Sequence, residues 1–296
     1  MKHFINQPAI NYSGYRKDHS PLLKVYPSKE EILEDLNILE GNYYYLRLFD
    51  CSIHAHRVLE VITEHKLNFK VMLGLSLRAE ENHVNHPFFY LHTEDQLSVN
   101  KLINQELINE IIELSHTYKE IISAISIGNE IRSIWSNQRV PINRMVDVVK
   151  EIKEKTDIPI TYCEEYQTWI EELSPLSEVV DFISIHTYPA WQGKTIEQAI
   201  ETLDQNYREA VLKFKDKDII ITETGWPTSS HGSRISIDVA NVRNQQIYLE
   251  DLASWSHDND VLVYIFEAFD EPWKGGEDPK EPEKNWGIYF ENRVKK

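Results

Sequence analysis

The sequence predicts an α/β fold of the (β/α)8 TIM-barrel class, because eight strand-like segments alternate with helix-like segments along 296 residues. An open doubly wound sheet usually carries a glycine-rich turn after its first strand, and here only Gly14 follows that strand. The sequence also has no internal repeat and no Ser/Gly/Pro-rich linker. We therefore expect residues 1–296 to form a single barrel domain.

The predicted strands are short apolar segments, and several lack the polar alternation of a half-exposed strand. Unbroken apolar segments are typical of parallel strands that are buried on both faces. The eight segments are 9–12, 43–49, 71–77, 121–130, 158–162, 179–188, 219–223 and 261–266.

The segments between them repeat apolar residues at the three- and four-residue spacing of an amphipathic helix. The predicted helices are 28–39, 54–65, 102–118, 141–156, 195–214 and 238–257. Ser28 and Glu31 form a capping box at the start of the first, and Asp238 is expected to cap the last. The connection over 78–97 is long for a barrel loop, and such loops are often functional. The aromatic tail over 286–290 is expected to dock on the barrel.

Composition narrows the possible ligands. The formal net charge is −17, which disfavours nucleic acid and anionic membrane surfaces and suits a neutral ligand. No apolar segment approaches the ~20 residues that a membrane helix needs. The first residues lack a signal-peptide core, so we expect a cytoplasmic protein, or a secreted or periplasmic one if a leader was removed. The two cysteines, Cys51 and Cys163, are expected to be free thiols.

Polar and aromatic side chains gather where the predicted strands end. In a barrel these carboxyl-terminal strand ends converge on the face that holds the active site. The residues at those positions are Asn11, Tyr12, Arg47, Asp50, Asn129, Glu130, Glu164, Glu165, His186, Tyr188, Glu223, Trp226, Glu267, Asp270 and Trp273. Carboxylates can bind hydroxyl groups and aromatic rings can stack on sugar rings, so a neutral polyhydroxylated ligand fits this lining.

Two of these residues, Glu130 and Glu223, each follow an apolar strand, and those strands would face each other across the barrel mouth. Retaining glycosidases hold two carboxyl groups ~5–5.5 Å apart, one as nucleophile and one as acid and base. Arg47 could keep the nucleophile ionised by charge pairing. Asn129, beside Glu130, could donate its amide to a sugar hydroxyl.

The sequence at these positions resembles glycoside hydrolase family 17, a family of retaining barrels. The matching segments are Gly128-Asn129-Glu130, Thr222-Glu223-Thr224-Gly225-Trp226-Pro227, Arg47-Leu48-Phe49, 181–189, 266–274 and Trp286-Gly287-Ile288-Tyr289. The resemblance implies action on β-1,3-glucans, by hydrolysis or by transfer to another glucan, with no cofactor.

The same resemblance assigns roles to individual residues. It implies that Glu130 is the acid/base and Glu223 the nucleophile, and that Tyr188, Glu267 and Trp273 line the glycone side of the cleft. Further candidate substrate contacts are Tyr12, Arg47, Asn129, His186, Trp191, Trp226 and Asp270.

Two alternatives stay open at this point. A metal-dependent barrel hydrolase is suggested by His54-Ala55-His56, with His83, His86 and His92 nearby, although that class places its His pair after the first strand; we predict no metal. A non-catalytic glucan-binding barrel is the other. The sequence leaves open endo or exo action, hydrolysis or transfer, preferred chain length and branching, and oligomeric state.

Overall fold

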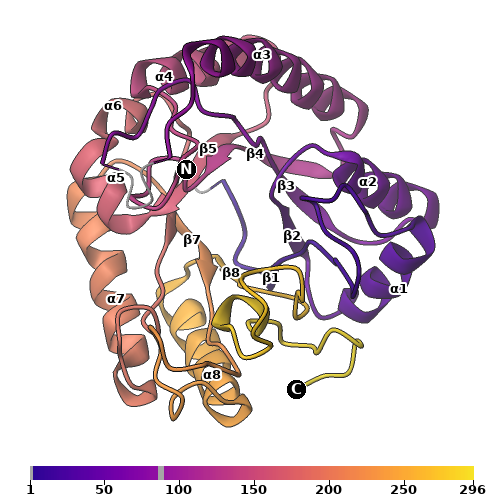
Figure 1. Ribbon diagram of the computed structural model, residues 1–296, viewed down its shortest axis with the longest axis vertical. Helices are drawn as coiled ribbons and strands as arrows, with labels where there is room; N and C mark the ends of the chain where they lie inside the picture. Colours follow the sequence, from indigo (N-terminus) through magenta and orange to yellow (C-terminus); the bar gives the residue numbers. More distant parts are fainter. Residues whose placement is uncertain (1–2, 86–89) are drawn as a thin grey trace.

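A computed structural model describes residues 3–85 and 90–296. Eight parallel strands form a closed barrel in chain order, with β1 paired to both β2 and β8. The helices surround the barrel (Figure 1). The strands are β1 (Ala9–Asn11), β2 (Tyr45–Leu48), β3 (Lys70–Gly74), β4 (Ile122–Asn129), β5 (Ile160–Glu165), β6 (Ile183–His186), β7 (Ile219–Thr224) and β8 (Val263–Ile265). The predicted barrel class is confirmed.

The helices agree with the apolar periodicity of the sequence, with two short additions after β5. They are α1 (Lys29–Leu39), α2 (Ile53–His65), α3 (Glu94–Thr117), α4 (Ile142–Lys153), α5 (Tyr166–Glu172), α6 (Ser174–Ser177), α7 (Ile196–Lys213) and α8 (Val242–Asn259), with a 3-10 turn η1 (Pro282–Lys284). The predicted capping box is present: the Ser28 hydroxyl accepts from the Glu31 amide, and the Glu31 carboxylate accepts from the Ser28 amide.

Several predicted boundaries were wrong, including that of the sixth strand, which begins at Ile183 rather than at 179. Helix α3 begins at Glu94 rather than 102, because Thr93 and Gln96 form a second capping box well before the apolar stripe starts. The N-cap of α8 is Asn241 and not Asp238. Strand β3 ends at Gly74 and not at 77, so the apolar residues beyond it are buried in a loop rather than in the sheet.

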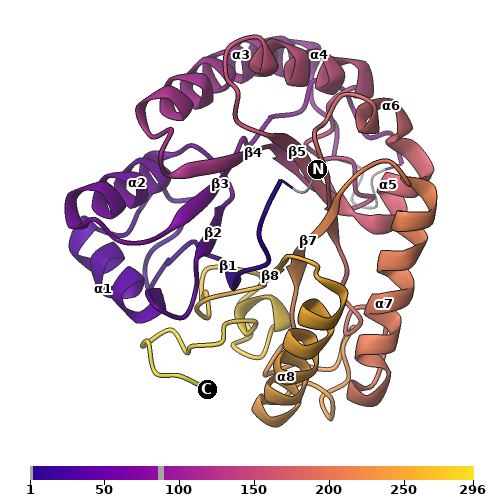
Figure 2. The same ribbon diagram turned by 180° about the vertical axis from the view of Figure 1, so that it is seen from behind.

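The interior of the barrel is filled from its amino-terminal end. Phe4 packs edge-on against Phe182, with ring centroids 4.9 Å apart, and against Tyr45 at 5.9 Å. These rings belong to a small apolar cluster inside the strands, separate from the larger core between strands and helices. Figure 2 shows the N-terminal segment running across the barrel opening. Apolar side chains therefore fill the amino-terminal end of the barrel, and the carboxyl-terminal strand ends form the opposite mouth.

The C-terminal segment docks as predicted. Trp286, Ile288 and Tyr289 are buried, and Tyr289 forms a parallel bridge with Phe269 just beyond β8. The segment lies beside β1 and β8 in both views (Figures 1 and 2). Cys51 and Cys163 are buried free thiols, as expected. Among the described residues, no helix is long and apolar enough to cross a membrane.

Candidate active site

Glu223 lies in β7 and is almost fully buried, with 5% of its surface exposed. One carboxylate oxygen, Oε1, accepts from Arg47 Nη1 at 2.6 Å, and Oε2 accepts from the Tyr188 hydroxyl at 2.7 Å. Burial alone would raise the pKa of Glu223, but the positive charges of His186 and Arg47, with the Tyr188 hydrogen bond, hold that pKa below its usual 4.5. Glu223 is thus ionised and positioned, as a nucleophile must be.

Arg47 supports this end of the site from β2. Its guanidinium is buried and also donates to Asn11 Oδ1 at 2.8 Å and to Asn129 Oδ1. The amide oxygen of Asn129 is therefore engaged, which leaves its NH2 group to donate to a ligand. Arg47 is buried behind Glu223 and does not itself line the active-site cleft.

Glu130 is the first residue after β4, and its backbone has a left-handed φ of 50°. Its side chain is 21% exposed, more open than that of Glu223. Oε1 contacts His186 Nδ1 at 2.7 Å, and Oε2 accepts from the Trp135 indole N–H at 3.3 Å. The left-handed conformation is unfavourable for a residue with a side chain, so the surrounding turn must hold it in place.

A second buried carboxylate, Glu164, holds that turn. It accepts hydrogen bonds from the amide of Arg132 at 3.0 Å, the hydroxyls of Tyr162 (2.5 Å) and Ser133, and the amide of Glu165 at 3.0 Å. Burial, followed by the negative charge of Glu130, raises the pKa of Glu164 to about 7. Glu164 therefore holds Arg132 and Ser133, the second and third residues after the strained Glu130 backbone.

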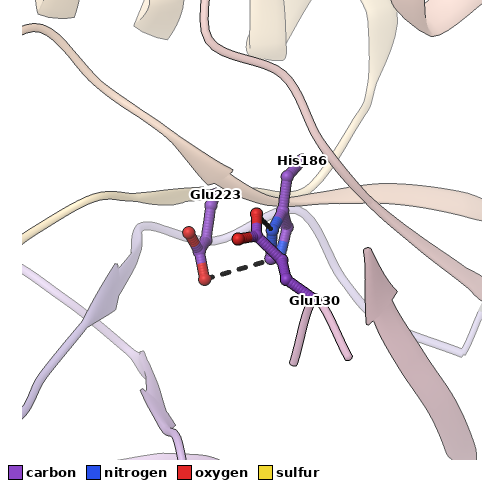
Figure 3. A group of neighbouring side chains, drawn as sticks. All are labelled: Glu130, His186 and Glu223. Carbon is purple, nitrogen blue, oxygen red and sulfur yellow. Dashed lines mark hydrogen bonds and ion pairs between the residues drawn. The ribbon is translucent and has the colours of Figure 1, made fainter. Parts of the chain in front are cut away.

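His186 contacts both candidate catalytic carboxylates, and Figure 3 shows the three side chains together. Its Nδ1 contacts Glu130, and its Nε2 lies 3.5 Å from Glu223 Oε1. Burial would lower the pKa of His186, but the charge of Glu223 and the hydrogen bonds with Cys163 and Glu130 raise it to about 10. A protonated imidazole thus bridges two carboxylates across the barrel mouth.

One carboxylate oxygen of Glu130, one of Glu223 and one ring nitrogen of His186 all lie within 4.8 Å of one another. That separation agrees with the ~5–5.5 Å between the carboxyl groups of retaining glycosidases and is too short for the ~6.5–9.5 Å of inverting enzymes. The three residues could in principle hold a metal ion. A protonated imidazole offers no lone pair to a metal, however. The two carboxylates, Glu130 and Glu223, are therefore better suited to acid–base and nucleophilic chemistry.

The pair opens into a cleft of about 940 Å³. Eight of the predicted site residues line it, namely Tyr12, Asn129, Glu130, His186, Tyr188, Trp191, Glu223 and Trp273. The lining combines carboxylates with aromatic rings, as sugar binding requires. Tyr12 contributes little polarity, because its buried hydroxyl donates to Asp35 at 3.1 Å.

Three other predicted sugar contacts do not line this cleft. Trp226 is fully buried, packs against Tyr248 and donates its indole N–H to the Val239 carbonyl at 2.8 Å. Asp270 accepts from the Gly287 amide and from Lys296, and so holds the C-terminal tail. We now expect both to support the cleft wall rather than to touch sugar.

Glu267, the third, is buried beneath the lining. It accepts from Lys274 Nζ at 2.6 Å, and Lys274 also pairs with Glu271 at 2.7 Å. Lys274 and Glu271 line the cleft and Glu267 does not. The sequence had predicted Glu267 as a sugar contact, but Glu271 and Lys274 are the groups of this segment that face the cleft.

Several lining residues were not among the predicted site residues, including Trp135, Tyr166, Glu271 and Lys274. Glu271 and Lys274 lie in the 266–274 segment that the motifs had singled out, and that position was a signal that could have identified them. Glu165, one of the strand-end residues expected on this face, also lines the cleft. Burial, and then the charge of Glu130, raises the pKa of Glu165 to about 7.

The histidines of the metal-hydrolase alternative do not meet at one point. His54 stacks on Tyr15 with ring centroids 5.4 Å apart, whereas His56 pairs with Glu110 at 2.7 Å. His83 contacts the Ser136 carbonyl and His92 the Asn137 carbonyl. His86 lies outside the described residues. This arrangement argues against a metal centre built from these side chains.

Known proteins carry the same architecture. A family model described as the BtgE/BtgC glycoside hydrolase domain matches residues 9–287. A probable glucan endo-1,3-beta-glucosidase, btgC, of Aspergillus fumigatus is 25% identical over 288 residues, covering 90% of this chain and 39% of that protein. The chain therefore spans about two fifths of the length of this curated relative.

Two solved structures are similar over nearly the whole chain. An endo-laminarinase from Formosa has a TM-score of 0.81 and 24% identity, covering 96% of this chain and 83% of that chain. A glycoside hydrolase family 17 β-1,3-glucanosyltransferase from Rhizomucor miehei has a TM-score of 0.70 and 22% identity, covering 97% and 94%. At these identities the two structures support the fold.

Proposed function

The chain belongs to the BtgE/BtgC glycoside hydrolase domain family, and from that membership and the site we propose that it cleaves β-1,3-glucan or its oligosaccharides with retention of anomeric configuration. The observation that carries the proposal is the approach of Glu130 and Glu223 to within 4.8 Å around His186. The family membership agrees with the resemblance to glycoside hydrolase family 17 that the sequence motifs indicate.

In the first step, the Glu223 carboxylate attacks the anomeric carbon of a bound glucosyl unit. Glu130 Oε2 gives a proton to the glycosidic oxygen as the bond between that oxygen and the carbon breaks. The product is a sugar ester of Glu223 and a shortened glucan with a new hydroxyl group. Arg47 and Tyr188 keep Glu223 ionised and oriented until it attacks.

In the second step, Glu130 acts as a base. It removes a proton from an incoming hydroxyl, whose oxygen bonds to the anomeric carbon while the ester bond breaks and its electrons return to Glu223. Two inversions give net retention. Neither step requires a cofactor or a metal.

The substrate class follows from the lining and the charge. Tyr188, Trp191 and Trp273 offer ring faces, and the cleft carboxylates can accept from hydroxyl groups. A protein with a net charge of −17 suits a neutral glucan better than a polyanion such as nucleic acid. The curated btgC relative is named for the same linkage.

The alternative is a β-1,3-glucanosyltransferase on the same substrates. It shares the first step and differs only in the acceptor, which is a sugar hydroxyl instead of water. Trp135 and Tyr166 in the cleft lining could hold such an acceptor.

A time course of products from laminarin and from laminaripentaose tests the proposal. Mixed oligosaccharides indicate endo cleavage, glucose or laminaribiose alone indicates attack from a chain end, and products longer than the pentaose indicate transfer. Proton NMR of the first product should show the β-anomer, whereas an α-anomer contradicts double displacement. A chelator should leave the rate unchanged, and Glu223→Gln is the inactive control.

A further inference from the structure

Trp135 lies in the turn after β4, five residues beyond Glu130, and it is the residue of that turn that reaches back to the catalytic pair. It lines the cleft, yet 45% of its surface is exposed. Its indole N–H donates to Glu130 Oε2 at 3.3 Å. A large aromatic side chain is thus open to solvent and bonded to the acid/base at the same time.

The oxygen that Trp135 contacts is the one that must exchange protons. Oε1 of Glu130 is occupied by His186 Nδ1 at 2.7 Å, which leaves Oε2 to face the glycosidic oxygen or the incoming hydroxyl. An indole N–H can donate but cannot accept, so it can hold the Oε2 atom of Glu130 in place without competing for the proton that Glu130 removes in the second step.

Trp135 and the cleft residues next to it lie near Glu130, on the leaving-group side of the catalytic pair, and not on the side of Glu223. Glu165 and Tyr166, at the junction of β5 and α5, also line the cleft, and β5 is the strand next to β4. A sugar that departs from, or returns to, the anomeric carbon must pass Glu130. The exposed part of the Trp135 side chain can therefore contact the sugar on the leaving-group side.

We propose that Trp135 is the residue that selects the acceptor. Its ring face binds the sugar that leaves in the first step and that can return in the second, and its N–H orients Glu130 Oε2. The inference rests on the proposed function. In the step concerned, the acceptor hydroxyl loses its proton to Glu130 Oε2, its oxygen bonds to the anomeric carbon, and the Glu223 carboxylate departs with the electron pair.

The test measures how the glycosyl-enzyme divides between water and sugar. A 4-nitrophenyl β-laminaribioside serves as donor and laminaribiose as added acceptor. Both outcomes start from one intermediate, so the ratio of transfer product to hydrolysis product reports the acceptor side alone. Wild type is compared with Trp135→Ala, Trp135→Phe and, as a matched control, Ile134→Ala, whose side chain is 63% exposed in the same turn and does not line the cleft.

Trp135→Ala should lower the ratio at least roughly tenfold, the usual effect of removing one apolar contact from a binding site. Trp135→Phe should keep a ratio close to that of wild type, because the ring face remains. Because Trp135→Phe lacks the indole N–H that orients Glu130 Oε2, its turnover rate should fall while the ratio is kept. Ile134→Ala should match wild type in both measurements.

The outcomes separate this inference from the proposed function. If wild type releases no nitrophenol and Glu223→Gln behaves the same, the proposed function fails. If wild type turns over but Trp135→Ala leaves the ratio unchanged, the acceptor role of Trp135 is overturned while the function stands. If Trp135→Phe lowers the ratio as much as Trp135→Ala, the ring-face assignment is wrong.

Discussion

Glu223 and Glu130, the two strand-end residues to which we assign catalysis, differ in burial, in the charges around them and in backbone conformation. Glu223 lies within β7, is almost fully buried, and is held by Arg47 and Tyr188. Glu130 lies just past β4 in a left-handed conformation, is partly exposed, and has the carboxylates of Glu164 and Glu165 nearby. Glu223 has a buried guanidinium and a hydroxyl as direct partners, whereas Glu130 has His186 and Trp135 as direct partners and further acids nearby at the edge of the cleft.

This difference shows how one barrel mouth gives two chemically similar side chains different tasks. A nucleophile must stay ionised, so it benefits from a buried cation. An acid/base must gain and lose a proton in each cycle, so it benefits from access to solvent and substrate. His186 contacts both groups and couples their charges.

The largest expected effect comes from neutralising the two carboxylates separately. We expect Glu223→Gln to abolish hydrolysis of both laminarin and an activated aryl glycoside, because no ester can form. Glu130→Gln should lose roughly 10²–10⁴-fold on laminarin, the usual contribution of general acid catalysis, but should retain ester formation from an activated aryl donor.

The measurement is a nitrophenol burst with and without added azide. Azide needs no base, so it should rescue turnover of Glu130→Gln as a β-glycosyl azide and should not rescue Glu223→Gln. Equal behaviour of the two variants would remove the distinction between the two strand ends.

Removing the buried positive charge of Arg47 should make the surroundings of Glu223 more like those of Glu130. In Arg47→Gln, the rise in the pKa of Glu223 that burial causes is opposed by His186 and Tyr188 but no longer by the Arg47 charge. Activity should then fall first at low pH, with the acidic limb of kcat/KM moved to higher pH. Arg144→Gln, on α4 outside the cleft lining, is the control. An unshifted acidic limb would mean that Arg47 does not set the charge of Glu223.

Tyr188→Phe should produce a smaller change in the same direction. It removes one hydrogen bond to Glu223 Oε2 and leaves the ring in the cleft. We expect a loss of about tenfold in kcat/KM, because a hydrogen bond to a charged group contributes ~1.5–3 kcal/mol. A higher KM alone, with kcat and the pH profile unchanged, would assign Tyr188 to sugar binding instead.

The smallest effect on chemistry, but a distinct effect on stability, is expected at Glu164. Its pKa is raised from 4.5 in the unfolded chain to about 7 in the folded protein, so the folded state binds more protons between those values. Its contribution to stability is complete below about pH 4.5 and is lost as the pH rises through about 7. The pKa difference corresponds to roughly 3 kcal/mol.

Urea unfolding at pH 5 and pH 8 measures this contribution. Wild type should lose stability between the two pH values by more than Glu164→Gln does, because glutamine cannot ionise. Glu201→Gln, an exposed position on α7, should keep the wild-type dependence. The same pH dependence in Glu164→Gln and wild type would show that Glu164 is not the protonated group.

The sequence was sufficient to predict the fold and to single out Glu130 and Glu223 as neighbours at the barrel mouth, whereas their proposed roles came from the family resemblance. Buried parallel strands are apolar without interruption, so strands ending in Glu130 and Glu223 stood out, and a closed barrel brings opposite strand ends together. The distance between the two carboxylates, and the protonated His186 between them, could not be predicted, because both depend on rotamers and on contacts between residues far apart in the sequence.

The errors were largest where a strand end leads into a loop. Trp226 and Glu267 lie close to strand ends, yet neither lines the cleft. Trp226 packs against Tyr248 of α8, and Glu267 is buried and bonded to Lys274. Trp135 is five residues past its strand and reaches the site. Sequence position indicates which loop surrounds a cleft, but the side chain that enters the cleft depends on the path of the turn.

Trapping the intermediate tests the double-displacement mechanism most directly. A 2-deoxy-2-fluoro β-laminaribiosyl fluoride should inactivate the enzyme, raise its mass by one fluorinated disaccharide, and label the peptide that contains Glu223 at that residue. Glu223→Gln should remain unlabelled under the same conditions. A label on Glu130 or on any other carboxylate, or turnover of the reagent with inversion and without labelling, would contradict the roles assigned to the two strand ends.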